Sequence, residues 1–221
     1  MSDNRTAVIF DLDGTLLDTI DDLADSMNHV LEENGLSAHP VEAYFQFIGN
    51  GMAKLVERAL PDDLQRDAAQ IEAFTEAFRI AYDARWNCKS KPYPGIPELL
   101  DALVAENVPL GVCSNKPEPF TQKCVAQLLP SWGFTCVLGH SDAFPRKPDP
   151  SSTVHIASQL GFTPADTWFI GDSGVDMQTA SAAGARAVGV LWGFRSETEL
   201  RDHGAMHVIE TPDELRSLIG I

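Results

Sequence analysis

The segment VIFDLDGTLLDT (residues 8–19) decides how this sequence folds. Its apolar start is typical of a buried strand, and it runs directly into Asp11, Asp13, Gly14 and Thr15. An unpaired carboxylate is costly to bury, so a strand that ends on two acids one residue apart is unusual. The pattern indicates that both acids have a task at the end of this strand.

The rest of the chain divides into two parts with different periodicities. Apolar residues recur at helical spacing in three segments that follow the first strand, residues 18–35, 51–60 and 64–86, and no strand is predicted there. Beyond residue 92, predicted helices alternate with short apolar segments. These segments are predicted strands, at residues 108–115, 134–140, 166–174 and 185–193. Such alternation is typical of parallel strands joined by helices.

The sequence therefore predicts an α/β fold, a Rossmann-like parallel-sheet core with an inserted α-helical cap domain. Residues 1–16 and 92–221 form the predicted core, and residues 17–91 form the predicted cap. Ligands bind beyond the carboxyl ends of parallel strands. A module inserted directly after the first strand would cover that site, which is why we expect it to be a cap.

Composition excludes several classes of partner and compartment. The 221 residues carry a formal net charge of −16, which disfavours nucleic acid and anionic membranes as partners. No apolar run is as long as a membrane span, and the N-terminus lacks a signal-peptide pattern. The four cysteines have no zinc-site spacing and suit a reducing compartment. We expect a cytoplasmic protein, and the sequence predicts no oligomeric state.

Polar side chains follow several of the predicted strands. They are Asp11 and Asp13, Ser114 and Asn115, Lys147, and Asp172 and Asp176. In an open parallel sheet these positions can converge in one crevice. The carboxylates would repel one another unless a cation lay among them, and oxygen ligands alone favour Mg²⁺.

Mg²⁺ beside a lysine suits phosphoryl transfer, because both neutralise charge on phosphoryl oxygens. An aspartate could then attack phosphorus and form an aspartyl-phosphate. A carboxylate two residues further on could protonate the leaving oxygen and later accept a proton from water. Hydrolysis of phosphate monoesters is among the slowest uncatalysed reactions, so this concentration of charge has a purpose.

Four short segments in the same order resemble the motifs of the haloacid dehalogenase superfamily. They are DLDGTLLDT (residues 11–19), VCSN (112–115), RKPDP (146–150) and GDSGVD (171–176). The chain is similar to phosphatases of that superfamily that carry a helical cap. The resemblance covers nearly the whole chain and implies Mg²⁺ as the cofactor.

The resemblance also implies a role for each motif residue. Asp11 would be the nucleophile and Asp13 the acid/base, and both would be metal ligands. Lys147 would be the catalytic cation and would also bind phosphate. Thr15, Ser114 and Asn115 would lie at the phosphate. Asp172 would be a metal ligand, and Asp176 either a ligand or an acid behind the ligands.

Two further segments, FIGNGMAKLVERAL (residues 47–60) and KPYPGIPELLDAL (91–103), resemble those of phosphoglycolate phosphatases. This implies a small phosphorylated metabolite as the substrate, with 2-phosphoglycolate as the candidate. The turn of Gly49, Asn50 and Gly51 and the nearby Lys54 would then contact the substrate from the cap. Arg58 is expected to be a solvated surface charge.

Other functions stay open at this point. A sugar phosphomutase of the same superfamily would use the same motifs. A receiver-type signalling domain also places acids and a lysine around Mg²⁺, but the helical insertion and Asp13 argue against it. A dehalogenase would lack the acid at Asp13. A calcium loop starting at Asp11 is excluded, because Leu16 stands where glycine is needed and Asp22 where glutamate is needed. Asp176 could instead cap the helix that follows it.

Overall fold

The computed structural model describes residues 6–221, which form two compact units. One unit, Met1–Leu17 with Pro92–Ile221, is called the core unit below; the other, Asp18–Lys91, is called the helical unit. Residues 1–5, with which the predicted core segment starts, lie outside the described residues. Each unit is described by itself.

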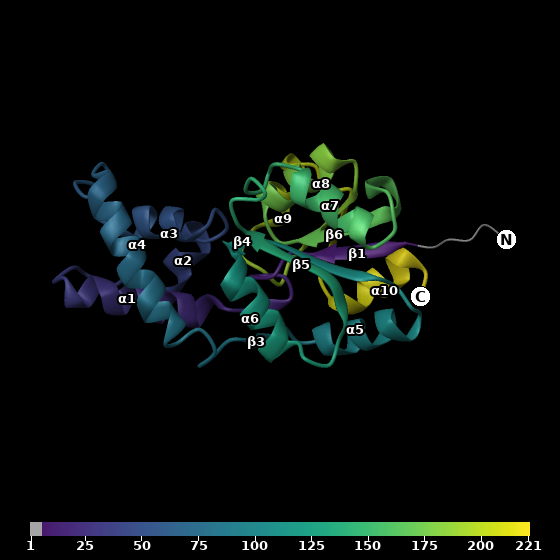
Figure 1. The fold of residues 1–221 in the computed structure, drawn as a ribbon, viewed down its shortest axis with the longest axis horizontal. Coiled ribbons are helices and arrows are strands. Elements are labelled where there is room, and N and C mark those ends of the chain that lie inside the picture. Colours follow the sequence, from purple (N-terminus) through teal and green to yellow (C-terminus); the bar gives the residue numbers. More distant parts are fainter. Residues whose placement is uncertain (1–5) are drawn as a thin grey trace. The chain divides into compact units, whose positions relative to one another are not determined.

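The core unit contains a six-stranded sheet in which every paired strand is parallel to its neighbour (Figure 1). The strand order is β5-β4-β1-β6-β7-β8. The strands are β1 (Ala7–Phe10), β4 (Leu110–Pro117), β5 (Phe134–His140), β6 (Thr167–Gly171), β7 (Arg186–Val190) and β8 (His207–Ile209). This sheet confirms the predicted α/β fold with a Rossmann-like core.

Helices cover both faces of the sheet. In Figure 1, α7, α8 and α9 lie on one face and α5, α6 and α10 on the other. The helices are α5 (Ile96–Ala105), α6 (Glu118–Leu128), α7 (Ser151–Gln159), α8 (Gly174–Ala183), α9 (Glu197–Asp202) and α10 (Pro212–Ile219), with a 3₁₀ turn at Pro164–Asp166. Coverage on both faces explains why the central strands are continuous apolar runs rather than alternating ones.

The central strand β1 is the most deeply buried element of the core unit. All four of its residues have 0% exposure. Ala7 and Ile9 belong to one apolar cluster with Phe169 of β6, and residues of β4, β7, α7, α8 and α9 also belong to it. Because this strand is packed on both sides, the chain that leaves its end has a rigid starting point.

The helical unit consists of four helices, α1 (Ile20–Glu33), α2 (Val41–Phe47), α3 (Met52–Ala59) and α4 (Ala68–Asp83). The predicted segments correspond to α1, α3 and α4, whereas α2 was not predicted. Asp67 caps α4 by accepting hydrogen bonds from the backbone N–H groups of Ala69 and Gln70. Two short strands, β2 (Leu17–Asp18) and β3 (Lys91–Pro92), pair where the chain passes between the units.

The buried carboxylate of Asp22 links the two ends of the helical unit by hydrogen bonds. Asp22, in the first turn of α1, accepts hydrogen bonds from the backbone N–H groups of Lys89 (3.0 Å) and Ser90 (2.8 Å). The Ser90 hydroxyl donates a third bond to it at 2.7 Å. These bonds tie the start of the unit to its end.

The C-terminal elements differ from the sequence-based prediction. Strand β4 continues to Pro117, two residues beyond the predicted end, and α9, β8 and α10 were not predicted. Strand β8 has only three residues and follows a short helix, so its apolar signal is weak. Among the described residues, no helix is both long and apolar enough to cross a membrane.

Candidate active site

The strand order brings the ends of β1 and β6 together. These strands are parallel neighbours, with Phe10 opposite Ile170. Asp11 follows β1 directly and Asp172 follows β6 directly. The chain runs outward from β1 in one direction to β5 and then returns to start β6, so a topological switch point lies here. In open α/β sheets such a point is where ligands bind.

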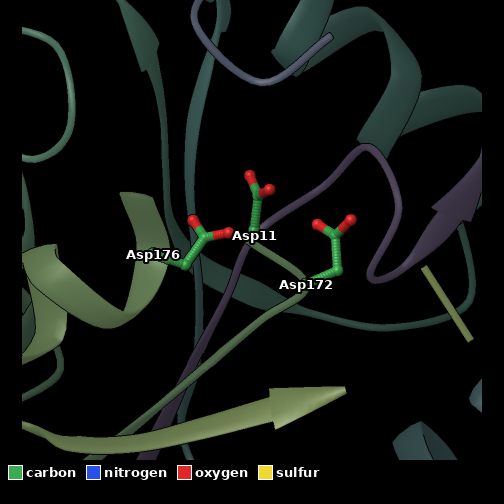
Figure 2. A group of neighbouring side chains, drawn as sticks. All are labelled: Asp11, Asp172 and Asp176. Atoms are coloured by element: carbon green, nitrogen blue, oxygen red, sulfur yellow. The ribbon is translucent and has the colours of Figure 1, made fainter. Parts of the chain in front are cut away.

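Three carboxylates form a buried cluster at this edge (Figure 2). One oxygen of each of Asp11, Asp172 and Asp176 lies within 4.8 Å of the others, and the set is called the acid cluster below. In Figure 2, Asp11 comes from the segment after β1, and Asp172 and Asp176 come from the segment that leads from β6 into α8. Asp176 comes from the first turn of α8, where it forms a capping box with Ser173. Helix capping and membership of the cluster are therefore compatible.

Lys147 lies against two members of the acid cluster. Its Nζ is 2.8 Å from Asp11 Oδ1 and 2.6 Å from Asp176 Oδ1. Burial disfavours the ammonium, but Asp11 and Asp176 outweigh burial and raise the pKa of Lys147 above its ordinary value. The lysine is therefore charged at neutral pH.

Asn115 holds the backbone of Lys147. Its side-chain oxygen accepts a hydrogen bond from Lys147 N at 2.8 Å, and its Nδ2 donates to Lys147 O at 3.2 Å. Both ends of the amide are used, which fixes the loop after β5 to the end of β4. This contact gives Asn115 a positioning role beside its predicted place at the phosphate.

The acid cluster has more negative charge than Lys147 balances. Burial raises the pKa of Asp11 to about 7, with Lys147 opposing the shift and Asp176 adding to it. Burial and the neighbouring Asp176 and Asp11 likewise raise the pKa of Asp172. A cation beside these oxygens would reverse both shifts. Oxygen donors alone suit a hard divalent cation, so the cluster fits a Mg²⁺ site.

Asp172 is oriented by two other loops. Its Oδ2 accepts a hydrogen bond from the backbone N–H of Phe194 at 2.8 Å, and its Oδ1 lies 3.4 Å from Thr15 Oγ1. Trp192 donates from Nε1 to the carbonyl of Thr15 at 2.9 Å. The loop after β7, which supplies Trp192 and Phe194, was not expected to contribute. Nearly every residue can donate from its backbone N–H, so the sequence does not show which residue makes such a contact.

Gly14 allows the first loop to pass close to Asp172. It has φ of +89°, a conformation that side chains rarely adopt. An added Cβ would lie 2.5 Å from Asp172 Oδ2. Position 14 therefore requires glycine both for its conformation and for the close approach to the acid cluster.

The carboxylate of Asp13 does not belong to the acid cluster. It pairs with Lys116, whose Nζ lies 3.0 Å from Oδ1 and 3.1 Å from Oδ2. Lys116 is buried and was missed in the sequence. The signal was available, because Ser114 and Lys116 are two residues apart on one strand. The hydroxyl of Ser114 accepts a hydrogen bond from Lys116 N at 3.2 Å.

The residues predicted to contact substrate from the cap belong to the helical unit. The exposed Lys54 pairs with the half-buried Glu57 at 2.7 Å. Asn50 accepts a hydrogen bond from Arg58 Nη2 at 2.8 Å, between Gly49 (φ +108°) and Gly51 (φ +88°).

The expectation that Arg58 is a solvated surface charge was wrong. Its Nη1 donates to the carbonyls of Gln46 and Phe47, both at 3.1 Å, while Nη2 donates to Asn50. A guanidinium presents several donors in a fixed plane, so one arginine can hold successive groups of a turn. Arg58 therefore shapes the 47–50 segment.

The family model for haloacid dehalogenase-like hydrolases matches residues 8–190, which include every predicted motif. The chain belongs to this family. The predictions of the superfamily and of a hydrolase are confirmed. The match starts in β1 and ends at the last residue of β7, so it includes the acid cluster, Lys147 and Lys116.

Relatives and solved structures resemble the chain over nearly its whole length. A phosphoglycolate phosphatase from Pseudomonas putida is 34% identical over 96% of this chain and 78% of its own length. One from Photorhabdus laumondii is 33% identical over 97% and 92%. A crystal structure from Lactobacillus delbrueckii gives a TM-score of 0.91 at 32% identity, covering 97% of this chain and 98% of that one. A predicted phosphoglycolate phosphatase from Haemophilus somnus gives 0.84 at 26%, covering 99% of both.

Proposed function

We propose that this hydrolase is a Mg²⁺-dependent phosphomonoesterase that forms an aspartyl-phosphate on Asp11. The observation that carries the proposal is the meeting of the acid cluster with Lys147 at the carboxyl ends of β1 and β6. A phosphoryl group has a negative charge that only cations and N–H donors can neutralise. The site combines a nucleophile, an ammonium and oxygen ligands for a metal.

Asp11, Asp172 and Asp176 are the candidates to hold the cation, because their oxygens converge and their burial raises the pKa of Asp11 and Asp172. Asp13 was the fourth predicted metal ligand. Its role as a ligand remains a proposal, and its carboxylate, which lies outside the acid cluster, does not support that role. Bound Mg²⁺ would neutralise phosphoryl charge and keep the carboxylates ionised. Lys147 adds the second positive charge.

The chemistry then follows from the side chains themselves. Asp11 attacks phosphorus, and the ester oxygen leaves with a proton from Asp13. In the second half, Asp13 accepts a proton from water, which attacks the phosphorylated Asp11 and releases inorganic phosphate. Ser114 and Thr15 are proposed to bind the phosphoryl oxygens, with Asn115 positioning Lys147.

We propose 2-phosphoglycolate as the substrate, a small phosphorylated metabolite. The support is the identity of 34% and 33% to two proteins named phosphoglycolate phosphatase. We propose that the helical unit is the cap, because it is inserted directly after the catalytic segment and contains the turn of Gly49, Asn50 and Gly51 with Lys54. Cap closure would exclude water from the site. The free cysteines support a proposed cytoplasmic location.

Phosphate release from a panel of phosphorylated metabolites, with Mg²⁺ and with EDTA, tests the proposal. We expect the highest kcat/KM for 2-phosphoglycolate, loss of activity in EDTA, and no turnover by Asp11→Asn. Retained activity in the folded Asp11→Asn protein would overturn the mechanism. An isomerised sugar phosphate without phosphate release would show a phosphomutase instead.

A further inference from the structure

Lys116 is a buried cation for which the mechanism above has no use. Its side chain is only 3% exposed, and its ammonium contacts both oxygens of Asp13. The backbone around it is fixed as well, since Lys116 N donates to Ser114 Oγ and its carbonyl accepts from Thr121 Oγ1 at 3.1 Å. The ammonium is therefore held in one place rather than on a mobile surface chain.

The two buried lysines serve different acids. Lys147 contacts Asp11 and Asp176, and therefore lies on the side of the nucleophile. Lys116 contacts Asp13, which serves the leaving oxygen in the proposed mechanism. A group bonded next to the leaving oxygen would thus approach Lys116 and not Lys147.

The charge of the protein makes this position important for an acidic substrate. At a net charge of −16, the chain repels anions at long range, and recognition of a second anionic group needs a local cation. A buried ammonium interacts strongly with a carboxylate because the surroundings screen it weakly. In 2-phosphoglycolate the carboxylate is attached to the carbon that bears the ester oxygen.

We infer that Lys116 binds the carboxylate of substrates in which that group is attached to the carbon bearing the phosphate ester, and so selects this class of phosphate ester. The inference rests on the proposed phosphatase function. On substrate binding, the Lys116 ammonium, which contacts Asp13 in the structure, would be shared between Asp13 and the substrate carboxylate. Specificity is then built into the core unit, on strand β4, as well as into the cap.

The test compares 2-phosphoglycolate with ethyl phosphate, which has a methyl group in place of the carboxylate. Both alcohols are poor leaving groups and need the proton from Asp13, so damage to Asp13 alone would slow both substrates equally. For Lys116→Met we expect kcat/KM for 2-phosphoglycolate to fall by about tenfold or more, the effect of one lost charged hydrogen bond. The value for ethyl phosphate should change far less.

Two comparison variants make the result specific. Lys89→Met removes an exposed lysine that also pairs with an aspartate, Asp25 at 2.7 Å, and should leave both substrates unaffected. Lys54→Met tests the rival carboxylate ligand in the helical unit. Lys116→Gln, which keeps a donor for Asp13, takes the place of Lys116→Met should that variant fail to fold.

The outcomes separate the two proposals. Equal losses on both substrates, or loss of selectivity only in Lys54→Met, would overturn the assignment of Lys116 and leave the phosphatase intact. Equal kcat/KM values of the wild-type protein for the two substrates would also overturn the assignment of Lys116. A wild-type protein that releases phosphate from neither substrate nor from the metabolite panel would overturn the proposed function itself.

Discussion

The acid cluster of the core unit and Asp22 of the helical unit are both buried carboxylate sites, yet they are satisfied in different ways. Asp22 accepts bonds from two backbone N–H groups and a hydroxyl. The acid cluster packs three carboxylates together against one lysine, and the pKa of Asp11 rises to about 7. A carboxylate surrounded by donors stabilises a fold, whereas crowded carboxylates indicate a site that needs a ligand.

Replacing Asp11, the proposed nucleophile, should produce the largest effect and the sharpest contrast. Asp11→Asn should lower kcat on the order of 10⁴-fold or more, because no covalent intermediate can form. It should not destabilise the metal-free protein, since it removes one of three repelling carboxylates. Phosphate-release kinetics and thermal unfolding in EDTA measure the two effects. Marked destabilisation would mean that Asp11, like Asp22, is structural.

Replacing Lys147, whose ammonium pairs with the acid cluster, should lower both kcat and the free energy of unfolding. Lys147→Met leaves Asp11 and Asp176 without their buried partner, which costs about 3–5 kcal/mol when one member of a buried pair is lost. Urea unfolding in EDTA measures the cost. An unchanged midpoint would show that the carboxylates take up protons and need no lysine.

Binding of Mg²⁺ should distinguish the acid cluster from the Asp22 site directly. Mg²⁺ at about 100 times its dissociation constant should stabilise the protein by about 2.7 kcal/mol, because it binds the folded state. The matching rise in Tm should disappear in Asp172→Asn and persist in Asp22→Asn. Thermal unfolding with increasing Mg²⁺ gives the comparison. A rise that survives in Asp172→Asn would place the cation elsewhere.

Asp22→Asn should have a smaller effect, confined to stability. An amide offers one acceptor oxygen where the carboxylate used two, so about 1–3 kcal/mol should be lost from unsatisfied donors. The turnover number of the folded protein should stay close to that of the wild type. Chemical unfolding and steady-state kinetics check both statements. A large fall in kcat would give Asp22 a part in the reaction.

The smallest effect on stability is expected at the surface of the helical unit. Lys54 and Glu57 form an exposed i,i+3 pair at 2.7 Å, and such pairs contribute less than about 0.5 kcal/mol. Glu57→Gln should therefore leave the unfolding midpoint almost unchanged. A clear loss of stability would show that this pair has a structural role.

Much of the core unit could be predicted because its pattern is local. Apolar strands that end in acids gave the parallel sheet and pointed to Asp11, Asp172 and Lys147, which the structure brings together. The same logic missed Lys116, since the predicted strand ended at Asn115 and a lysine beyond a strand usually lies in solvent, whereas β4 continues to Pro117. The structure leaves the carboxylate of Asp13 outside the acid cluster, which the sequence did not show because spacing cannot show which way a carboxylate points.

Contacts made by backbone groups were beyond sequence analysis for a different reason. Phe194 serves Asp172 through its N–H, a group that nearly every residue has. Helix α2 and strand β8 are too short for a clear periodicity. Arg58 was misjudged because its partners are carbonyls of a turn whose shape the sequence does not display.

The pairing of β1 has a consequence for how this chain folds during synthesis. Val8 pairs with Leu110 on one side and with Trp168 on the other, so β1 has no partner in the sheet until Leu110 is synthesised and lacks its second until Trp168 is. At about 5–20 residues per second, β1 waits many seconds for the ribosome to deliver β6. The helices of residues 18–91 are translated in that interval, so Asp11 is synthesised early but the side chains that surround it are assembled late.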